Sequence, residues 1–223
     1  MGQAIGNTLP MAIGVAISPI PIIAVVLMLG TPRARANGPA FALGWLAGLT
    51  IVGTIVLVAA NGNATSSSGG PATWVNVLKL VFGILFLLLA AHSWRGRPKA
   101  GEDAAMPKWM QAIDDFGAGK SLGAGVLLSG LNPKNLALTA AAAAAIAQTD
   151  IAGGQQAVAL AVFILIGSLT ILVPVAIYFV MGAKAKEILD ELKAFMSAHN
   201  AAIMTVLLLV LGAKLIGDAI AGF

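Results

Sequence analysis

The sequence has no cysteine and few charged residues. Disulfide bonds, thiolate metal sites and thiol nucleophiles are therefore excluded. Charged residues make up 10% of the chain and hydrophobic residues 59%, whereas about a quarter of the residues in a soluble domain are charged. The nucleotide-binding pattern GxxxxGK[ST] is also missing, so the chain has no P-loop with which to use nucleotide energy. Together these absences argue against a soluble globule and against a nucleotide-driven pump.

What the sequence does contain is a series of apolar segments. Each is about long enough to cross a hydrocarbon core of about 30 Å as a helix. None shows the alternation of apolar and polar residues that is typical of a barrel strand. We therefore predict an all-α integral membrane protein, with residues 1–223 forming a single transmembrane domain. The six predicted transmembrane helices cover residues 8–29, 39–60, 74–92, 121–147, 156–181 and 200–220.

The basic residues predict the orientation of these spans. Ten of the thirteen lie in three alternate loops, and the other loops and the N-terminal tail have none. By the positive-inside rule the basic loops are cytoplasmic. Both termini then lie outside a bacterial plasma membrane, and the uncharged start of the chain does not predict a signal peptide. The ten loop residues are Arg33, Arg35, Arg95, Arg97, Lys99, Lys108, Lys120, Lys184, Lys186 and Lys193.

The spans fall into two similar halves. The first and fourth spans both contain a small polar residue followed by proline, and an odd number of spans per half makes the halves point in opposite directions. Inverted repeats of this kind are the architecture of many secondary transporters. We predict three-helix repeats at residues 1–93 and 121–223. Residues 94–120 form a cytoplasmic linker with an amphipathic helix, which either lies in the headgroup region or packs under the bundle.

The prolines of the first and fourth spans predict helices that are broken inside the membrane. Proline interrupts a helix, but it is favoured at the first position of a new one after a Ser or Asn cap. The new helix starts carry partial positive charge, which suits an anion. Prolines that simply kink a membrane helix are the structural alternative. The predicted substrate-binding residues are Ser18, Pro19, Pro21, Asn132, Pro133, Lys134 and Asn135, with Thr139 as a further hydrogen-bonding group.

Three lysines lie within the predicted spans. Lys134 is the deepest, and a charge kept at that depth suggests contact with a substrate or ion. Lys79 either couples to an ion or snorkels to the interface. Lys214 and Asp218 are four residues apart, so an ion pair on one helix is expected. No catalytic constellation, metal-ligand cluster or cofactor motif is evident, so we expect no enzyme, no metal, no cofactor and no nucleic-acid partner.

Three stretches support a resemblance to a known family. They are SPIPIIAVVLMLGTPRARANGPAFALGW from Ser18, PKWMQAIDDF from Pro107 and NPKNLALTAAAAAAIAQ from Asn132. The chain resembles the glycolipid-addressing (GAP, or Sap) family of actinobacterial membrane proteins, which is similar in turn to the lysine-exporter (LysE) superfamily. The resemblance implies movement of an envelope glycolipid, or a polar precursor, across the plasma membrane. The motif at Ser18 is SPIP and not the Pro-Gly-Pro of amino-acid exporters.

We therefore expect a secondary exporter of an envelope glycolipid, its precursor or another small anionic or zwitterionic solute. One alternative is a non-transporting membrane adaptor for an envelope-lipid export assembly, and another is an amino-acid exporter. Expected partners are membrane lipids and the substrate. A homodimer and a larger lipid-transporter complex are left open.

Overall fold

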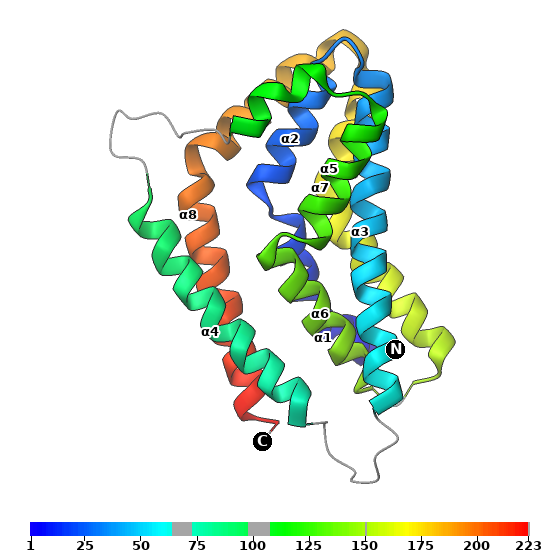
Figure 1. Cartoon of the computed structure of the whole chain (residues 1–223), viewed down its shortest axis with the longest axis vertical. Coiled ribbons are helices and arrows are strands. Elements are labelled where there is room, and N and C mark those ends of the chain that lie inside the picture. Colours follow the sequence, from blue (N-terminus) through cyan, green and yellow to red (C-terminus); the bar gives the residue numbers. More distant parts are fainter. Residues whose placement is uncertain (64–72, 98–107, 150, 223) are drawn as a thin grey trace.

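The computed structural model describes residues 1–63, 73–97, 108–149 and 151–222, and within these ranges it is helical without strands. The predicted all-α class is confirmed (Figure 1). In chain order the helices are α1 (Gly2–Ala16), α2 (Pro19–Leu29), α3 (Ala34–Asn63), α4 (Thr73–Arg95), the 3-10 helix η1 (Lys108–Asp115), α5 (Ala118–Gly130), α6 (Pro133–Ala147), α7 (Gly153–Met181), the short 3-10 turn η2 (Gly182–Lys184) and α8 (Ala185–Ile220).

Several of these helices can cross a membrane by length and composition. Among the described residues, α3, α4, α7 and α8 each qualify alone, and α1 with α2 qualifies as one bent span. The predicted fourth span is occupied by α5 and α6, of 13 and 15 residues. Each is shorter than the roughly 20 residues that a straight span needs. The structure thus supports a multi-pass membrane protein with four or five such spans, and the six-span count stays a prediction.

Proline and a polar cap explain both helix breaks. Between α1 and α2 the chain bends by 53°. Ser18 there is in an extended conformation and Pro19 opens the next helix. At the second break, Asn132 is extended, Pro133 opens α6, and the Asn132 side chain accepts a hydrogen bond from the Lys134 N–H at 3.0 Å. Proline suits the first position of a helix because that position needs no N–H donor. Both helix breaks in the structure therefore lie at the residues that the sequence predicts.

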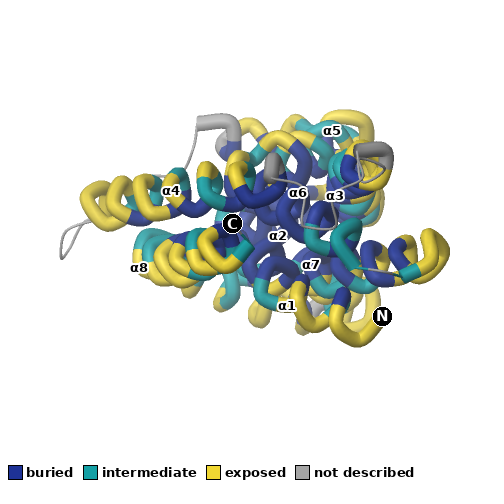
Figure 2. The backbone as a smooth tube through the Cα atoms, turned by 90° about the horizontal axis from the view of Figure 1, so that it is seen from below, coloured by how far each residue is buried: buried dark blue, intermediate teal, exposed yellow. Residues whose placement is uncertain are grey.

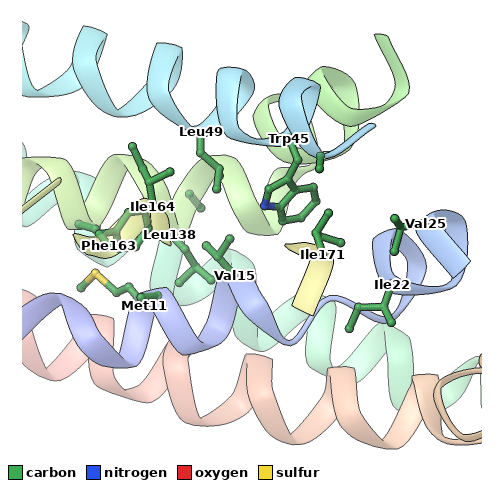
Figure 3. Close-up of a cluster of buried hydrophobic side chains, with 14 of the residues drawn as sticks. Met11, Val15, Ile22, Val25, Trp45, Leu49, Leu138, Phe163, Ile164 and Ile171 are labelled. Carbon is green, nitrogen blue, oxygen red and sulfur yellow. The ribbon is translucent and has the colours of Figure 1, made fainter. Parts of the chain in front are cut away.

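The helices pack in a regular arrangement around these breaks. In Figure 1, α3 runs beside α5 and α6, and α7 runs beside α1 and α2. The helices α4 and α8 pack along each other at one side of the molecule (Figure 2). Only 28% of the most apolar 18-residue window of each is buried. The centre of the bundle is formed by buried apolar side chains from α1, α3, α6 and α7. Figure 3 shows this for Met11, Leu49, Leu138 and Phe163.

The closest helix crossing depends on glycine. A Cβ on Gly125 of α5 would meet the backbone of Phe41 and Trp45 in α3, and a Cβ on Gly44 would meet the backbone of Leu122. Small residues let two membrane helices approach to backbone contact. This crossing fixes the first half of the chain against the second.

The two ends of the bundle differ in charge. One end of the bundle, which we call the basic end, holds the α2–α3 connection, the start of α5 and the η2 turn between α7 and α8 (Figure 1). In sequence these segments contain Arg33, Lys120 and Lys184. The N-terminus and the α6–α7 connection lie at the opposite end (Figure 1).

The predicted amphipathic linker helix is partly described. Residues 98–107, which include Lys99, lie outside the described residues, as does the loop 64–72. The following segment is η1, in which Met110 and Ile113 are buried against the bundle with 4% and 2% of their surface exposed. The Asn37 amide of α3 donates to the Phe116 carbonyl just after it, at 2.9 Å. Of the two alternatives, packing under the bundle is the one that these contacts support.

Candidate functional site

The broken end of α1 satisfies all of its backbone carbonyls. A helix C-terminus leaves carbonyls without intrahelical partners, and hydrocarbon offers no water to replace them. The N–H groups of Ile17 and Ser18 donate to the carbonyls of Ile13 and Ala16, each at 2.9 Å. The Ser18 hydroxyl lies 2.7 Å from the Val15 carbonyl and donates to it. Two carbonyls in the last turn remain to be satisfied, and their donor comes from another helix.

That donor is the Lys134 side chain of α6. Its ammonium donates to the carbonyl oxygens of Gly14 and Ile17, the latter at 2.9 Å, and to the Ser18 hydroxyl at 2.7 Å. An ammonium has three protons to donate, and all three are used here. A cation is also favoured at a helix C-terminus, where the helix dipole is negative. Lys134, only 3% exposed, thus joins the two broken spans.

A second contact joins the breaks. Asn135, fully buried, donates through its amide to the Leu128 carbonyl at the end of α5, at 3.0 Å. Its side-chain oxygen lies 3.2 Å from the Ser18 hydroxyl. Each break therefore receives polar support from residues near the start of α6, and the two breaks touch each other.

The predicted site residues do not all face one space. Ser18, Pro19, Pro21, Lys134 and Asn135 are buried. In contrast, Asn132 is half-buried and Pro133 is exposed. The structure therefore brings Ser18, Lys134 and Asn135 into direct contact, whereas Pro133 shapes the second break from the surface. The binding of a substrate by these residues remains a prediction.

The other lysines of the spans also have polar partners. Lys79 of α4, 9% exposed, donates to the side-chain oxygen of Gln148 at 3.2 Å, just after the end of α6. Lys214 and Asp218 form the expected ion pair on α8, with about a third of each side chain exposed. Among the described residues, no group of three or more His, Asp and Glu side chains is arranged to hold a metal ion.

A family model matches this chain from residue 8 to residue 221. The model describes Sap, a sulfolipid-1-addressing protein. The chain belongs to the sulfolipid-1-addressing protein family. The matched range covers both helix breaks, and the resemblance to glycolipid-addressing proteins is confirmed. No match was found among curated proteins or solved structures, so the similarity to lysine exporters stays a prediction.

Thr170 of α7 also contacts the first helix break, although the sequence did not predict it. The Thr170 hydroxyl of α7 donates to the Ala16 carbonyl at the end of α1, at 2.5 Å. Thr170 lies three residues after Gly167, whose lack of a side chain leaves room for Val15. A threonine in an apolar helix ordinarily bonds to its own backbone, so the sequence carried no signal for this contact.

Two buried polar atoms at the centre have no partner among the described residues. They are the Thr139 hydroxyl of α6 and the Trp45 indole N–H of α3. Both side chains are fully buried, with 0% exposed. Buried polar groups are normally paired, so these two mark places where a water or a substrate group would gain hydrogen bonds.

The opposite end of the bundle is closed by polar contacts between helices. The Asn61 amide of α3 donates to the Gln156 side chain of α7 at 2.7 Å. The contact of Lys79 with Gln148 ties α4 to the end of α6. The Asn76 amide of α4 donates to the Gly222 carbonyl. These contacts join both halves of the chain at that end.

At the basic end, in contrast, there is a cavity of about 720 Å³. It lies between the end of α2, the end of α7 and the first turns of α8. The structure thus has a cavity at the basic end, and polar contacts join its helices at the opposite end.

Proposed function

We propose that this chain is a secondary transporter that exports an envelope glycolipid, its precursor or another small anionic or zwitterionic solute. The observation that carries the proposal is the contact of two broken spans through Lys134 deep in the bundle. Half-helices that meet near the middle of a membrane are typical of secondary transporters, because their ends provide polar groups where hydrocarbon provides none. A buried ammonium in a membrane segment is costly, and ionisable groups kept there typically mark substrate or ion pathways.

The helix contacts support the proposed inverted repeat. If residues 1–93 correspond to residues 121–223, then α1 and α2 correspond to α5 and α6, α3 to α7, and α4 to α8. The packing of α3 on α5 and α6 then matches the packing of α7 on α1 and α2. The pairing of α4 with α8 maps onto itself under the same exchange. This is the pattern expected when two opposed halves pack around a pseudo-two-fold axis.

The family supports the substrate class. The family takes its name from a protein that addresses a sulfolipid, so a role in lipid export or addressing is the natural inference for this chain. Sulfolipids are amphiphiles with an anionic group. An anionic group could replace the α1 carbonyls as acceptor of the Lys134 ammonium.

That exchange suggests a mechanism. In this structure Lys134 holds the end of α1 against α6. A substrate anion that takes over the ammonium would release α1, which packs on both α6 and α7. The contacts with α6 and α7 that α1 would then give up lie in the half of the bundle nearest the opposite end (Figure 1). Substrate binding would in this way favour opening of that end, as alternating access requires.

The cavity and the polar ties favour one assignment of state. With the basic loops in the cytoplasm, the cavity faces inward, and the ties at Asn61 and Asn76 close the outer side. The structure then corresponds to an inward-facing state ready to take up a substrate.

Transport can be tested with purified protein in liposomes. The probe is an NBD-labelled sulfated galactolipid, with its movement between leaflets followed by dithionite quenching under an imposed proton or sodium gradient. We expect gradient-dependent movement for the wild type. If purified protein moves no lipid under either gradient, yet copurifies with a larger transporter, the adaptor alternative replaces the transporter.

Cross-linking the outer side should stop transport. Since the chain has no native cysteine, the double variant Asn61→Cys/Gln156→Cys can be joined by a short bis-methanethiosulfonate reagent, which forms a reducible disulfide with each thiol. We expect more than about 90% of the transport to be lost on cross-linking and regained when the link is reduced, because the outer side must open in each cycle. Each single variant, treated identically, is the control. Full transport by the cross-linked protein would contradict alternating access at this end.

The orientation can be tested by thiol labelling in intact cells. Gly154→Cys at the opposite end and Lys184→Cys at the basic end are both at exposed positions. A membrane-impermeant maleimide should label Gly154→Cys in intact cells and Lys184→Cys only after permeabilisation, because the basic loops are expected in the cytoplasm. The reverse pattern would overturn the orientation and with it the inward-facing assignment.

A further inference from the structure

The cavity at the basic end has one apolar wall. This wall consists of side chains from the last turns of α2 and the end of α7, namely Val26, Leu27, Leu29, Tyr178 and Phe179. Phe179 is 52% exposed, and the adjacent Val180 is 84% exposed. The wall therefore continues into the apolar surface that α7 presents on the outside of the bundle. An apolar chain could pass from the surrounding bilayer into this cavity without crossing a polar barrier on that side.

The other wall is charged. Its lining includes the cations Arg35, Lys186 and Lys193 and the carboxylates Asp114 and Asp190. Three cations and two carboxylates leave one net positive charge. The single Asp190 carboxylate pairs with both lysines, at 2.8 Å to Lys186 and 3.3 Å to Lys193.

Arg35 completes the charged wall. Among the described residues, no carboxylate lies within ion-pair distance of it. A guanidinium presents a planar fork of donors that matches the oxygens of a sulfate, phosphate or carboxylate. An anion in this cavity would therefore gain Arg35 and a share of two lysines that have only one counter-ion between them.

We propose that this cavity is a loading site for the anionic headgroup of a membrane amphiphile from the adjacent leaflet. Arg35 and Lys193 bind the anionic group, and the α2 and α7 wall takes the first part of the apolar chain. The volume of about 720 Å³ is in the range of pockets for drug-sized ligands, so a sugar headgroup with its anionic group fits. The apolar wall and its continuation onto α7 favour an amphiphile over a free anion. The inference deepens the proposed function, because the site lies where an inward-facing exporter would take up its substrate.

Binding can be measured without any transport. The purified full-length protein in neutral detergent is titrated with sulfatide, a galactolipid with one sulfate, and with galactosylceramide, the same lipid without the sulfate. Binding is measured from the rise in the unfolding temperature with lipid concentration. Sodium sulfate at matched concentration separates a free anion from a lipid headgroup. We expect a rise with sulfatide, and at least tenfold weaker effects with the other two.

Variants then locate the binding. Arg35→Gln and Lys193→Gln should each weaken sulfatide binding about tenfold, because a charge-assisted hydrogen bond is lost. Arg33→Gln is the matched control, since Arg33 lies two residues away, is also exposed, and does not line the cavity. Its affinity should change less than about twofold. Equal losses in all three variants would mean a diffuse charge effect and would overturn the site, as would equal binding of sulfatide and galactosylceramide or no binding of either.

The outcome can be separated from that of the transporter proposal. The Asn61/Gln156 cross-linked protein should still bind sulfatide, because the cavity is at the other end. Selective binding without any transport would leave the loading site in place and make the chain an adaptor. Transport that Arg35→Gln and Lys193→Gln leave unchanged would keep the transporter and overturn the loading site. Competition by sulfate at concentrations similar to those of sulfatide would assign the site to a free anion instead.

Discussion

Replacing Lys134 with methionine is expected to lower the stability of the protein and to abolish transport. Methionine has a similar length and no donor, so the carbonyls of Gly14 and Ile17 lose their partner in a buried part of the bundle. Each unpaired buried acceptor costs about 1–3 kcal/mol. Removal of a buried charge offsets part of that loss, so we expect a net loss of about 2 kcal/mol. On the scale of soluble chains of this length, this is a fall of about 4–8 °C in the unfolding midpoint.

The measurement is thermal unfolding of the purified variant together with the liposome assay. The matched control is Lys79→Met, in which a lysine with a single amide partner is removed from another span. Its midpoint should fall by less than half as much. If Lys134→Met is as stable as the wild type but does not transport, Lys134 acts on the substrate and its link to α1 is not structural. Unchanged stability with full transport would contradict both roles.

The second large effect is expected at the crossing of α3 and α5. Gly125→Ala places a Cβ against the carbonyl oxygen of Phe41 and within 2.7 Å of the Trp45 backbone nitrogen. Neither backbone can move alone, because α3 packs along both α5 and α6. Overpacking typically costs about 1–3 kcal/mol, and we expect at least the upper value here. Most of the protein should then be lost to aggregation when it is extracted in detergent.

Gly123→Ala on the same helix is the matched control. A Cβ there meets nothing within 4 Å. Alanine also favours a helix over glycine by about 1 kcal/mol, so this variant should be as stable as the wild type or slightly more stable. The measurement is the monodisperse fraction on size exclusion and the unfolding midpoint. Equal behaviour of the two variants would show that α3 and α5 do not cross this closely.

Much of the architecture could be predicted from local features of the sequence. The apolar runs predict helices because hydrocarbon requires every backbone group to be paired within the segment. Ser18–Pro19 and Asn132–Pro133 predict both breaks because proline acts on its own and the preceding residues. The pair Lys214–Asp218 follows from helical spacing alone. Three quoted stretches of sequence were enough to indicate the family.

Contacts between distant parts of the chain could not be predicted in this way. In the sequence Lys134 lies beside a helix start, which suggested that its ammonium contacts a substrate or ion. In the structure its ammonium reaches the end of α1, more than a hundred residues away, and all its protons are donated there. Pro133 has the same local pattern as Pro19, yet it is exposed and Pro19 is buried, because the neighbours that cover a residue come from other helices.

The sequence by itself therefore determined the kind of protein, its all-helical class, the places where two spans break and the family. Each of these depends on residues close together in the chain or on the overall match to a pattern. Only the tertiary structure decided which donors satisfy the broken end of α1, which end of the bundle is tied by Asn61 and Gln156, and where Arg35 and Lys193 line a common cavity. These depend on packing between helices, which local patterns of hydrophobicity and proline do not specify.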